Sequence, residues 1–263
     1  MPPTLYIIDS HAHLYAAFYA LGNLSSPRGE KTGATFGFVS TVLKIIREAR
    51  PDYLAAAFDM PGPTFRHKEF KDYKAQRKPM PDDLRPQVDW TREILEIMGV
   101  PIFQSKGFEA DDCIAELTRQ ARDKGCEVVI CSRDKDLQQL IGPHVKMIDT
   151  KTNDILDEAA LKQLKGIRPD QVVDLLALMG DASDNIPGVP GIGPKTAAGL
   201  IAQFGSMDQL YENIDEVKGK KRQLLVEHKD DALKSRWLVQ LDQKVPIALD
   251  LEACRLPEEF DRE

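Results

Sequence analysis

Cysteine is scarce in this sequence, and its four cysteines form no Cys-x-x-Cys pair. Zinc sites and the disulfide frameworks of small secreted domains are built from paired or regularly spaced cysteines. We therefore predict reduced core thiols in a cytoplasmic protein. Long hydrophobic runs are also missing, and the N-terminus lacks the basic, apolar and small-residue order of a signal peptide. These absences predict no membrane partner.

Positive charge is also in deficit, because the net charge at neutral pH is −7. Nucleic-acid-binding proteins are usually basic, so this balance argues against such a partner. However, acidic residues clustered around bound cations would have their local field inverted. Whether the partner is a nucleic acid must therefore be judged from the distribution of charge along the chain.

Short apolar runs that lead into an aspartate recur along the first half of the chain. Strands are predicted at residues 4–9, 53–59 and 127–132, leading into Asp9, Asp59 and Asp134. Further strands are predicted at 100–104 and 145–149, and helices at 35–50, 81–98 and 110–124. This alternation indicates a parallel sheet, whose carboxyl-terminal strand ends share one edge. Aspartate also begins turns and caps helices, which explains any one of these positions but less well all three.

After about residue 166 only helices are predicted, at 169–179, 194–204, 206–213 and 220–241. The expected organisation is an α/β domain over residues 1–166 and a helical domain over 167–263. The length of 263 residues suffices for a core with a smaller appended domain.

Nine acidic residues fall at the predicted element ends: Asp9, Asp59, Glu109, Asp111, Asp112, Asp134, Asp136, Asp181 and Asp184. If they share one cleft, their mutual repulsion calls for bound cations. Oxygen ligands without nearby cysteine favour Mg²⁺ or Mn²⁺ over zinc. The acids at residues 109–112 have an alternative role, since carboxylates also stabilise a helix N-terminus.

The stretch Gly180–Ala197 places Asp181 and Asp184 beside a Pro/Gly hairpin that ends at the start of a helix. Glycine turns at helix N-termini suit phosphates, so this stretch indicates metal next to phosphate. It is not a Walker A loop, because Pro194 separates Gly193 from Lys195 and no strand precedes it.

Together, Ile8-Asp9, Phe58-Asp59, Glu109–Asp112, Asp134–Asp136 and Gly180–Ala197 closely resemble the 5′ nuclease family, in order over residues 4–250. The nearest resemblance is to the 5′→3′ exonuclease domains of bacterial DNA polymerase I. It implies a PIN-like, mainly parallel sheet flanked by helices, and a helical domain with a helix–hairpin–helix of the 5′ nuclease type. The implied activity is divalent-metal-dependent hydrolysis of DNA at 5′ flaps, nicks and 5′ ends in replication and repair. It also implies a bacterial, nucleoid-associated monomer, with a polymerase domain as a candidate neighbour in the natural chain.

By this resemblance, Asp9, Asp59, Glu109 and Asp111 hold a first metal. Asp134, Asp136, Asp181 and Asp184 form a second site, and Asp112 lies between them or supports them. Two metal ions can polarise a phosphate, activate water and stabilise the leaving oxygen.

The segment Thr64–Lys78, which we call the basic segment, holds six Lys/Arg against two acids, with aromatic residues between them. Such a stripe suits a nucleic-acid backbone, although an ordinary charged helix would look similar. In the resembled family this region, about residues 64–80, is a helical arch over the 5′ single strand. The expected DNA contacts are Arg66, Lys68, Lys71, Tyr73, Lys74 and Arg77, and Lys74 and Arg77 also match family residues that reach the cleaved phosphate.

The resemblance assigns a second DNA contact to the hairpin, where backbone amides and Lys195 hold a duplex phosphate. The residues expected to bind are Gly188, Gly191, Gly193, Lys195 and Thr196. A monovalent cation such as K⁺ can sit among the hairpin carbonyls in this family. Such contacts position DNA without reading its sequence.

Four positions depart from the family pattern: His11, His13, Ala16 and Arg133. His11 and His13 form a His-x-His motif, which is also the start of TatD-type metal hydrolases with a (β/α)₈ barrel. Ala16 replaces a usual arginine, and Arg133 is a candidate to compensate for it. A DNA-binding module without turnover and a PIN-type ribonuclease remain as further alternatives.

Overall fold

The computed structural model describes residues 2–256 and shows a six-stranded sheet covered by helices. The strands are β1 (Thr4–Asp9), β2 (Tyr53–Ala57), β3 (Ile102–Phe103), β4 (Glu127–Cys131), β5 (Val145–Ile148) and β6 (Ile155–Leu156). Their order is β3-β2-β1-β4-β5-β6, and all neighbours are parallel except β5 and β6. The predicted mainly parallel α/β sheet is therefore confirmed, and an open sheet excludes the (β/α)₈ barrel of the TatD alternative.

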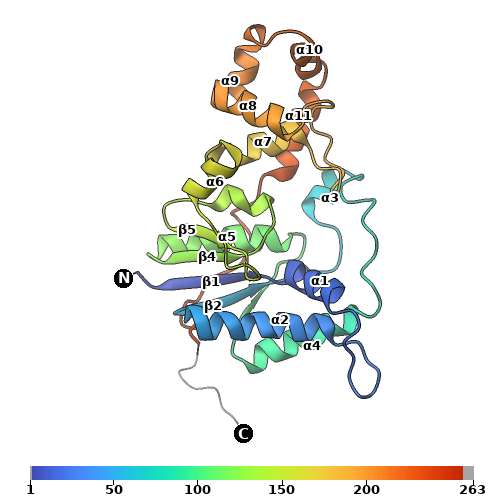
Figure 1. The fold of residues 1–263 in the computed structure, drawn as a ribbon, viewed down its shortest axis with the longest axis vertical. Coiled ribbons are helices and arrows are strands. Elements are labelled where there is room, and N and C mark those ends of the chain that lie inside the picture. Colours follow the sequence, from blue (N-terminus) through green and yellow to red (C-terminus); the bar gives the residue numbers. More distant parts are fainter. Residues whose placement is uncertain (1, 257–263) are drawn as a thin grey trace.

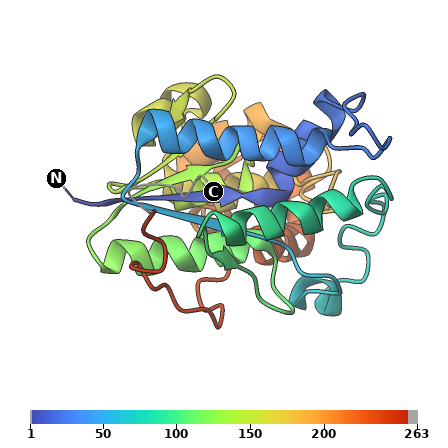
Figure 2. The ribbon, with the colours of Figure 1, turned by 90° about the horizontal axis from the view of Figure 1, so that it is seen from below.

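Alternate residues of the central strands enter two different cores. On β1, Leu5 and Ile7 pack toward α5 (Ala110–Asp123), whereas Ile8 packs on the opposite face. That opposite face is covered by α1 (Ser10–Ala20), α2 (Gly33–Lys44) and α4 (Arg85–Ile97). Figure 2 shows the blue helix α2 and the green helix α5 on opposite sides of the strands. Because side chains alternate along a strand, both faces of β1 are buried, as parallel strands require.

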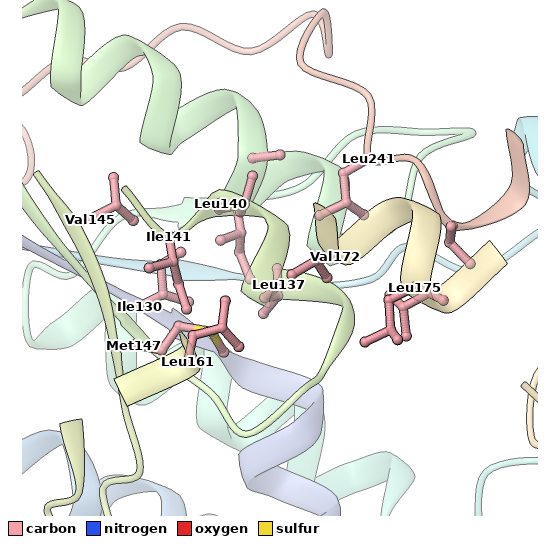
Figure 3. Close-up of a cluster of buried hydrophobic side chains, with 14 of the residues drawn as sticks. Ile130, Leu137, Leu140, Ile141, Val145, Met147, Leu161, Val172, Leu175 and Leu241 are labelled. Atoms are coloured by element: carbon pink, nitrogen blue, oxygen red, sulfur yellow. The ribbon is translucent and has the colours of Figure 1, made fainter. Parts of the chain in front are cut away.

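The core beneath α5 continues without interruption into the helical part of the molecule. Figure 3 shows this continuity: Ile130 of β4, Leu137 of the 3₁₀ turn Asp136–Leu140, Leu161 of α6 (Glu158–Lys165) and Val172 of α7 (Val172–Met179) belong to one cluster of buried side chains. The helical part is formed by α7, α8 (Pro194–Phe204), α9 (Met207–Glu212), α10 (Lys220–Glu227) and α11 (Lys229–Val239), at one end of the molecule (Figure 1). A shared core holds this helical part against the sheet.

Several predicted boundaries differ from the structure. The helix predicted from Pro81 begins at Arg85, and the helix predicted over 220–241 is divided at His228 into α10 and α11. The helix predicted over 35–50 ends in a π-helical turn, Ile45–Ala49. The sequence did not predict α1, α6 or β6. Short 3₁₀ turns at Pro169–Gln171 and Ile214–Glu216 complete the described elements.

The basic segment is not the continuous helix that the resemblance implied. Only α3 (Phe65–Glu69) is helical, and turns follow it. Backbone N–H of Lys74 donates to the Asp184 carbonyl at 3.0 Å, and Asn185 Nδ2 donates to the Asp72 carbonyl at 2.8 Å. These contacts hold the basic segment against the loop that follows α7. No helix within residues 2–256 is long and apolar enough to cross a bilayer.

Candidate active site

The carboxyl-terminal ends of β1 and β2 each position one aspartate. Asp9 caps α1 by accepting from the Ala12 N–H at 3.3 Å, and its other oxygen accepts from Ser132 Oγ at 2.7 Å. Asp59 Oδ1 accepts from the Ala110 N–H, the first residue of α5, at 2.8 Å. Ser132, at the end of β4, is a site residue that sequence reasoning missed. Its position as the last residue of a predicted strand was the available signal.

Glu109 lies at the N-terminus of α5 and is surrounded by donors from the basic segment. Its Oε1 accepts from Lys74 Nζ at 2.6 Å, and its Oε2 accepts from the Tyr73 hydroxyl at 3.0 Å. Burial disfavours the Lys74 ammonium, but the charges of Glu109 and Asp184 outweigh it and raise the pKa of Lys74. Lys74 therefore stays charged between carboxylates from two parts of the chain.

Arg66 and Asp112 occupy the interior beneath this site, which conflicts with Arg66 as a DNA contact and favours the supporting role of Asp112 over metal binding. Arg66 Nη1 and Nη2 each donate to one oxygen of Asp112 at 2.8 Å, and Arg66 Nε donates to the Leu238 carbonyl at 2.8 Å. Both side chains are fully buried. Arg66 is therefore not an exposed DNA contact, and Asp112 has no oxygen facing the cleft for a metal. Tyr73 is likewise buried, so it is not a DNA contact in this conformation.

Asp134, Asp136, Asp181 and Asp184 form the other half of the acidic edge, and cations hold the last two. Lys135 Nζ contacts Asp181 Oδ2 at 2.5 Å, and Arg77 Nε donates to Asp184 Oδ1 at 2.9 Å. Burial would raise the pKa of Asp181, but its hydrogen bonds from Lys135 and Ser183 outweigh that and lower it. Asp134 Oδ1 accepts from the Asp136 N–H at 2.8 Å, which closes the turn after β4.

The two halves share one electrostatic field. Burial first, and then the charges of Asp134 and Asp59, raise the pKa of Asp9 to about 7. Burial and the charges of Asp9 and Asp134 raise the pKa of Asp111 well above its usual value. The pKa of Asp136 is raised to about 7 in the same way, by burial first and then by the charges of Asp134, Asp184 and Asp181. These carboxyls therefore influence one another's protonation across the sheet edge.

The donor set of this cluster suits hard divalent cations, because it offers carboxylate oxygens and no thiolate. Among residues 2–256, however, no three such side chains already converge as metal ligands. Lys74, Arg77 and Lys135 instead neutralise part of the set. Burial is the largest cause of the raised pKa values of Asp9, Asp111 and Asp136, and neighbouring carboxylates raise them further. Cations near these three carboxyls would relieve that repulsion.

The departures from the family pattern also have defined places. His13 Nε2 is 3.0 Å from the Cys131 carbonyl and its ring packs edge-on against Phe38, which makes it structural. His11 Nδ1 accepts from the Asp59 N–H at 3.1 Å and so touches the site. Arg133 forms an ion pair with Asp149, with 3.1 Å between Arg133 Nε and Asp149 Oδ2.

The hairpin between α7 and α8 contains one glycine that is packed inside and others that are exposed. Gly188 is buried, its N–H donates to Ser235 Oγ at 2.9 Å, and a Cβ there would lie 2.4 Å from Gly180 N. The expectation that Gly188 contacts DNA is therefore wrong, because its amide is already used. Gly191, Gly193 and Lys195 are exposed and Thr196 is half-buried. Lys68 and Lys71 of the basic segment are exposed as well.

Comparison with known proteins places this geometry in a family. The 5′-3′ exonuclease N-terminal resolvase-like domain matches residues 4–166, and the 5′-3′ exonuclease C-terminal SAM fold matches residues 167–262. The chain is 37% identical to the 5′-3′ exonuclease of Aquifex aeolicus, covering 96% of this chain and 86% of that protein. It is 40% identical to DNA polymerase I of Caldicellulosiruptor bescii over 97% of this chain, but spans only 31% of that relative's length.

A solved structure has the same fold. The bacteriophage T5 D15 flap endonuclease, in a pseudo-enzyme–product complex with DNA and metal ions, superposes with a TM-score of 0.72 at 24% identity. The match covers 90% of this chain and 88% of the phage protein. With two family matches that together span residues 4–262, this chain belongs to the 5′-3′ exonuclease family.

Proposed function

We propose that this chain is a divalent-metal-dependent, structure-specific nuclease that hydrolyses DNA near 5′ ends, flaps and nicks. The observation that carries the proposal is the clustering of Asp9, Asp59, Asp111 and Asp134, whose charges act on one another at one sheet edge. The relatives' activity and the DNA and metal ions of the phage complex support it.

The first metal is proposed to bind Asp9, Asp59, Glu109 and Asp111, and the second Asp134, Asp136, Asp181 and Asp184. Asp112 is left out because Arg66 takes both of its oxygens. Mg²⁺ or Mn²⁺ bound there would polarise the phosphate and lower the pKa of a bound water. The chain's own contribution is orientation: Ser132 fixes Asp9, and the Ala110 N–H fixes Asp59.

Lys74 is proposed to stabilise the negative charge that develops on the phosphate during cleavage. Its Nζ lies 2.6 Å from Glu109 Oε1 and 3.8 Å from Asp184 Oδ2, so it stands between the two halves of the cluster. Arg77 is held by Asp184 while 54% of its side chain stays exposed, and it can turn toward an arriving strand. Preorganised cations of this kind stabilise a transition state without reorganisation cost.

Two surfaces are proposed to hold the DNA. Exposed Lys68 and Lys71 of the basic segment suit a single-stranded backbone. The hairpin ends at Gly193, where the N-terminus of α8 has no side-chain cap, so its amides and Lys195 can bind a duplex phosphate. K⁺ among the hairpin carbonyls stays a proposal.

The test is release of short products from a 5′-labelled flap DNA with Mg²⁺ or Mn²⁺, compared with EDTA. Asp111→Asn and Asp181→Asn should lower the rate by about 100-fold or more, as expected when groups essential to charge stabilisation are lost. Asp123→Asn, on the exposed end of α5, is the matched control. Equal cleavage by Asp111→Asn and by the control would show that the proposed site is wrong. Running RNA of the same shape in parallel separates a PIN-type ribonuclease.

A further inference from the structure

Arg92 of α4 lies beside the acidic edge without an anionic partner. The only hydrogen bond of its side chain to residues 2–256 is a long one, 3.5 Å from Nη2 to the Asp59 carbonyl oxygen. No carboxylate of the described residues lies within ion-pair distance of it. A guanidinium has five N–H donors, so most of its donor capacity is unused by the protein.

The other cations at this edge are already neutralised. Lys74 pairs with Glu109, Arg77 with Asp184 and Lys135 with Asp181. A phosphate that binds any of these three competes with a carboxylate for it. A phosphate that binds Arg92 does not compete with a carboxylate. Asp89 and Glu96 on the same helix affect the pKa of Arg92 but form no ion pair with it.

Packing fixes the orientation of Arg92. Its guanidinium lies 4.6 Å from the centroid of the Phe58 ring, which is fully buried at the end of β2. The edge of the His11 ring also packs on Phe58, with centroids 5.7 Å apart. Stacking on an aromatic face holds a guanidinium while leaving its in-plane N–H groups free. Burial lowers the pKa of Arg92 by more than the charges of Asp89 and Glu96 raise it.

We propose that Arg92 binds a backbone phosphate of the DNA strand, on the side of Asp59 away from α5. Asp59 separates the two regions, since its carboxylate accepts from the Ala110 N–H while its carbonyl faces Arg92. The phosphate held by Arg92 is therefore a neighbour of the one that is cut, and Arg92 is a positioning residue. This inference rests on the proposed function for the identity of the ligand as DNA.

Binding of a fluorescent 5′-flap DNA, measured in EDTA over a range of KCl concentrations, tests it without cleavage. Arg92→Gln should weaken binding by about three- to tenfold, the loss expected for one charged hydrogen-bonding contact. It should also reduce the slope of log K against log salt by about 0.7 to 0.9, the value for one phosphate. Arg92→Lys should keep the slope and lose part of the affinity, because the charge remains but the planar fork does not.

The matched control is Arg47→Gln, an exposed arginine of the Ile45–Ala49 turn, which precedes β2 at the opposite edge of the sheet. If Arg92→Gln gives the same affinity and salt slope as Arg47→Gln, Arg92 holds no phosphate and the inference is overturned. Failure of the wild-type protein to bind the DNA would overturn it as well. Wild-type binding without cleavage in Mg²⁺ would instead overturn the proposed nuclease activity, while the Arg92 comparison still decides the inference.

Discussion

Arg66 and Asp112 form a fully buried, bidentate ion pair directly beneath the acidic edge. The pair joins the basic segment, α5 and the end of α11, because Arg66 also donates to the carbonyls of Leu238 and Gln240. The same Asp112 accepts from the Glu109 N–H at 3.0 Å, which fixes the turn that carries Glu109 and Asp111. The pair therefore links the turn that carries the site to the end of α11, in addition to the shared hydrophobic core.

Removing Arg66 alone should be severely destabilising. Arg66→Met leaves Asp112 buried without compensation, a change that costs about 3–5 kcal/mol. Urea denaturation should show that loss, and Arg66→Met/Asp112→Leu should recover part of it. Arg85→Met, which breaks an exposed pair with Asp82, should cost about 1 kcal/mol or less and serves as control. Equal losses for Arg66→Met and Arg85→Met would contradict a stabilising role of the buried pair.

The metal-free protein should lose stability as the pH rises from about 4 toward 7. Asp9 and Asp136 have folded-state pKa values of about 7, above those of an unfolded chain, so the folded state binds more protons across this window. Calorimetry in EDTA should give a higher Tm at pH 5 than at pH 8. Mg²⁺ at pH 8 should raise the Tm, because a ligand that binds only the folded state stabilises it. A Tm that is unchanged by Mg²⁺ in wild type would count against the proposed metal site.

Substitution by alanine should lower the thermal stability at one glycine of the hairpin, Gly188, and leave it unchanged at another, Gly193. Gly188→Ala should destabilise the protein, because φ is +59° and the new Cβ would meet Gly180 backbone atoms at 2.4–2.6 Å. Gly193→Ala should leave the Tm nearly unchanged, since φ is −84° and nothing lies within 4 Å of a Cβ there. Gly193→Ala should still weaken duplex binding if the amides at this turn approach a phosphate. A similar Tm loss in both variants would show that the hairpin is packed differently.

Replacing Lys74 should affect the cleavage rate, whereas replacing Lys71 should affect the affinity for DNA. Lys74→Met should lower the single-turnover cleavage rate by about 100-fold, because it removes a charge placed between Glu109 and Asp184. Lys71→Met, on the exposed face of the basic segment, should raise the Kd for flap DNA and leave the rate at saturation nearly unchanged. The assignment of Lys74 fails if its variant changes only the Kd.

The sequence by itself determined five of the six strands, the aspartates that follow them and the hairpin. Apolar runs that end in Asp9 and Asp59 predicted parallel strands, and the structure pairs β1 and β2 in parallel with Asp9 opposite Ala57. The helix Pro194–Phe204 was predicted with its observed bounds, because Pro at the first turn and Gly after the last are local signals. These features depend on neighbours in sequence, which a single chain displays directly.

Only the tertiary structure decided which charged residues are available. Arg66 and Lys68 are two residues apart in one basic segment, yet one is buried on Asp112 and the other is exposed. Asp111 and Asp112 are adjacent, yet Asp111 joins the acidic cluster while Asp112 turns inward to Arg66. The charge pattern of the sequence does not show whether a side chain points inward or outward. For Arg66 this depends on Asp112, which is 46 residues away along the chain. Packing against α11 and the sheet therefore assigned the roles that the local sequence left open.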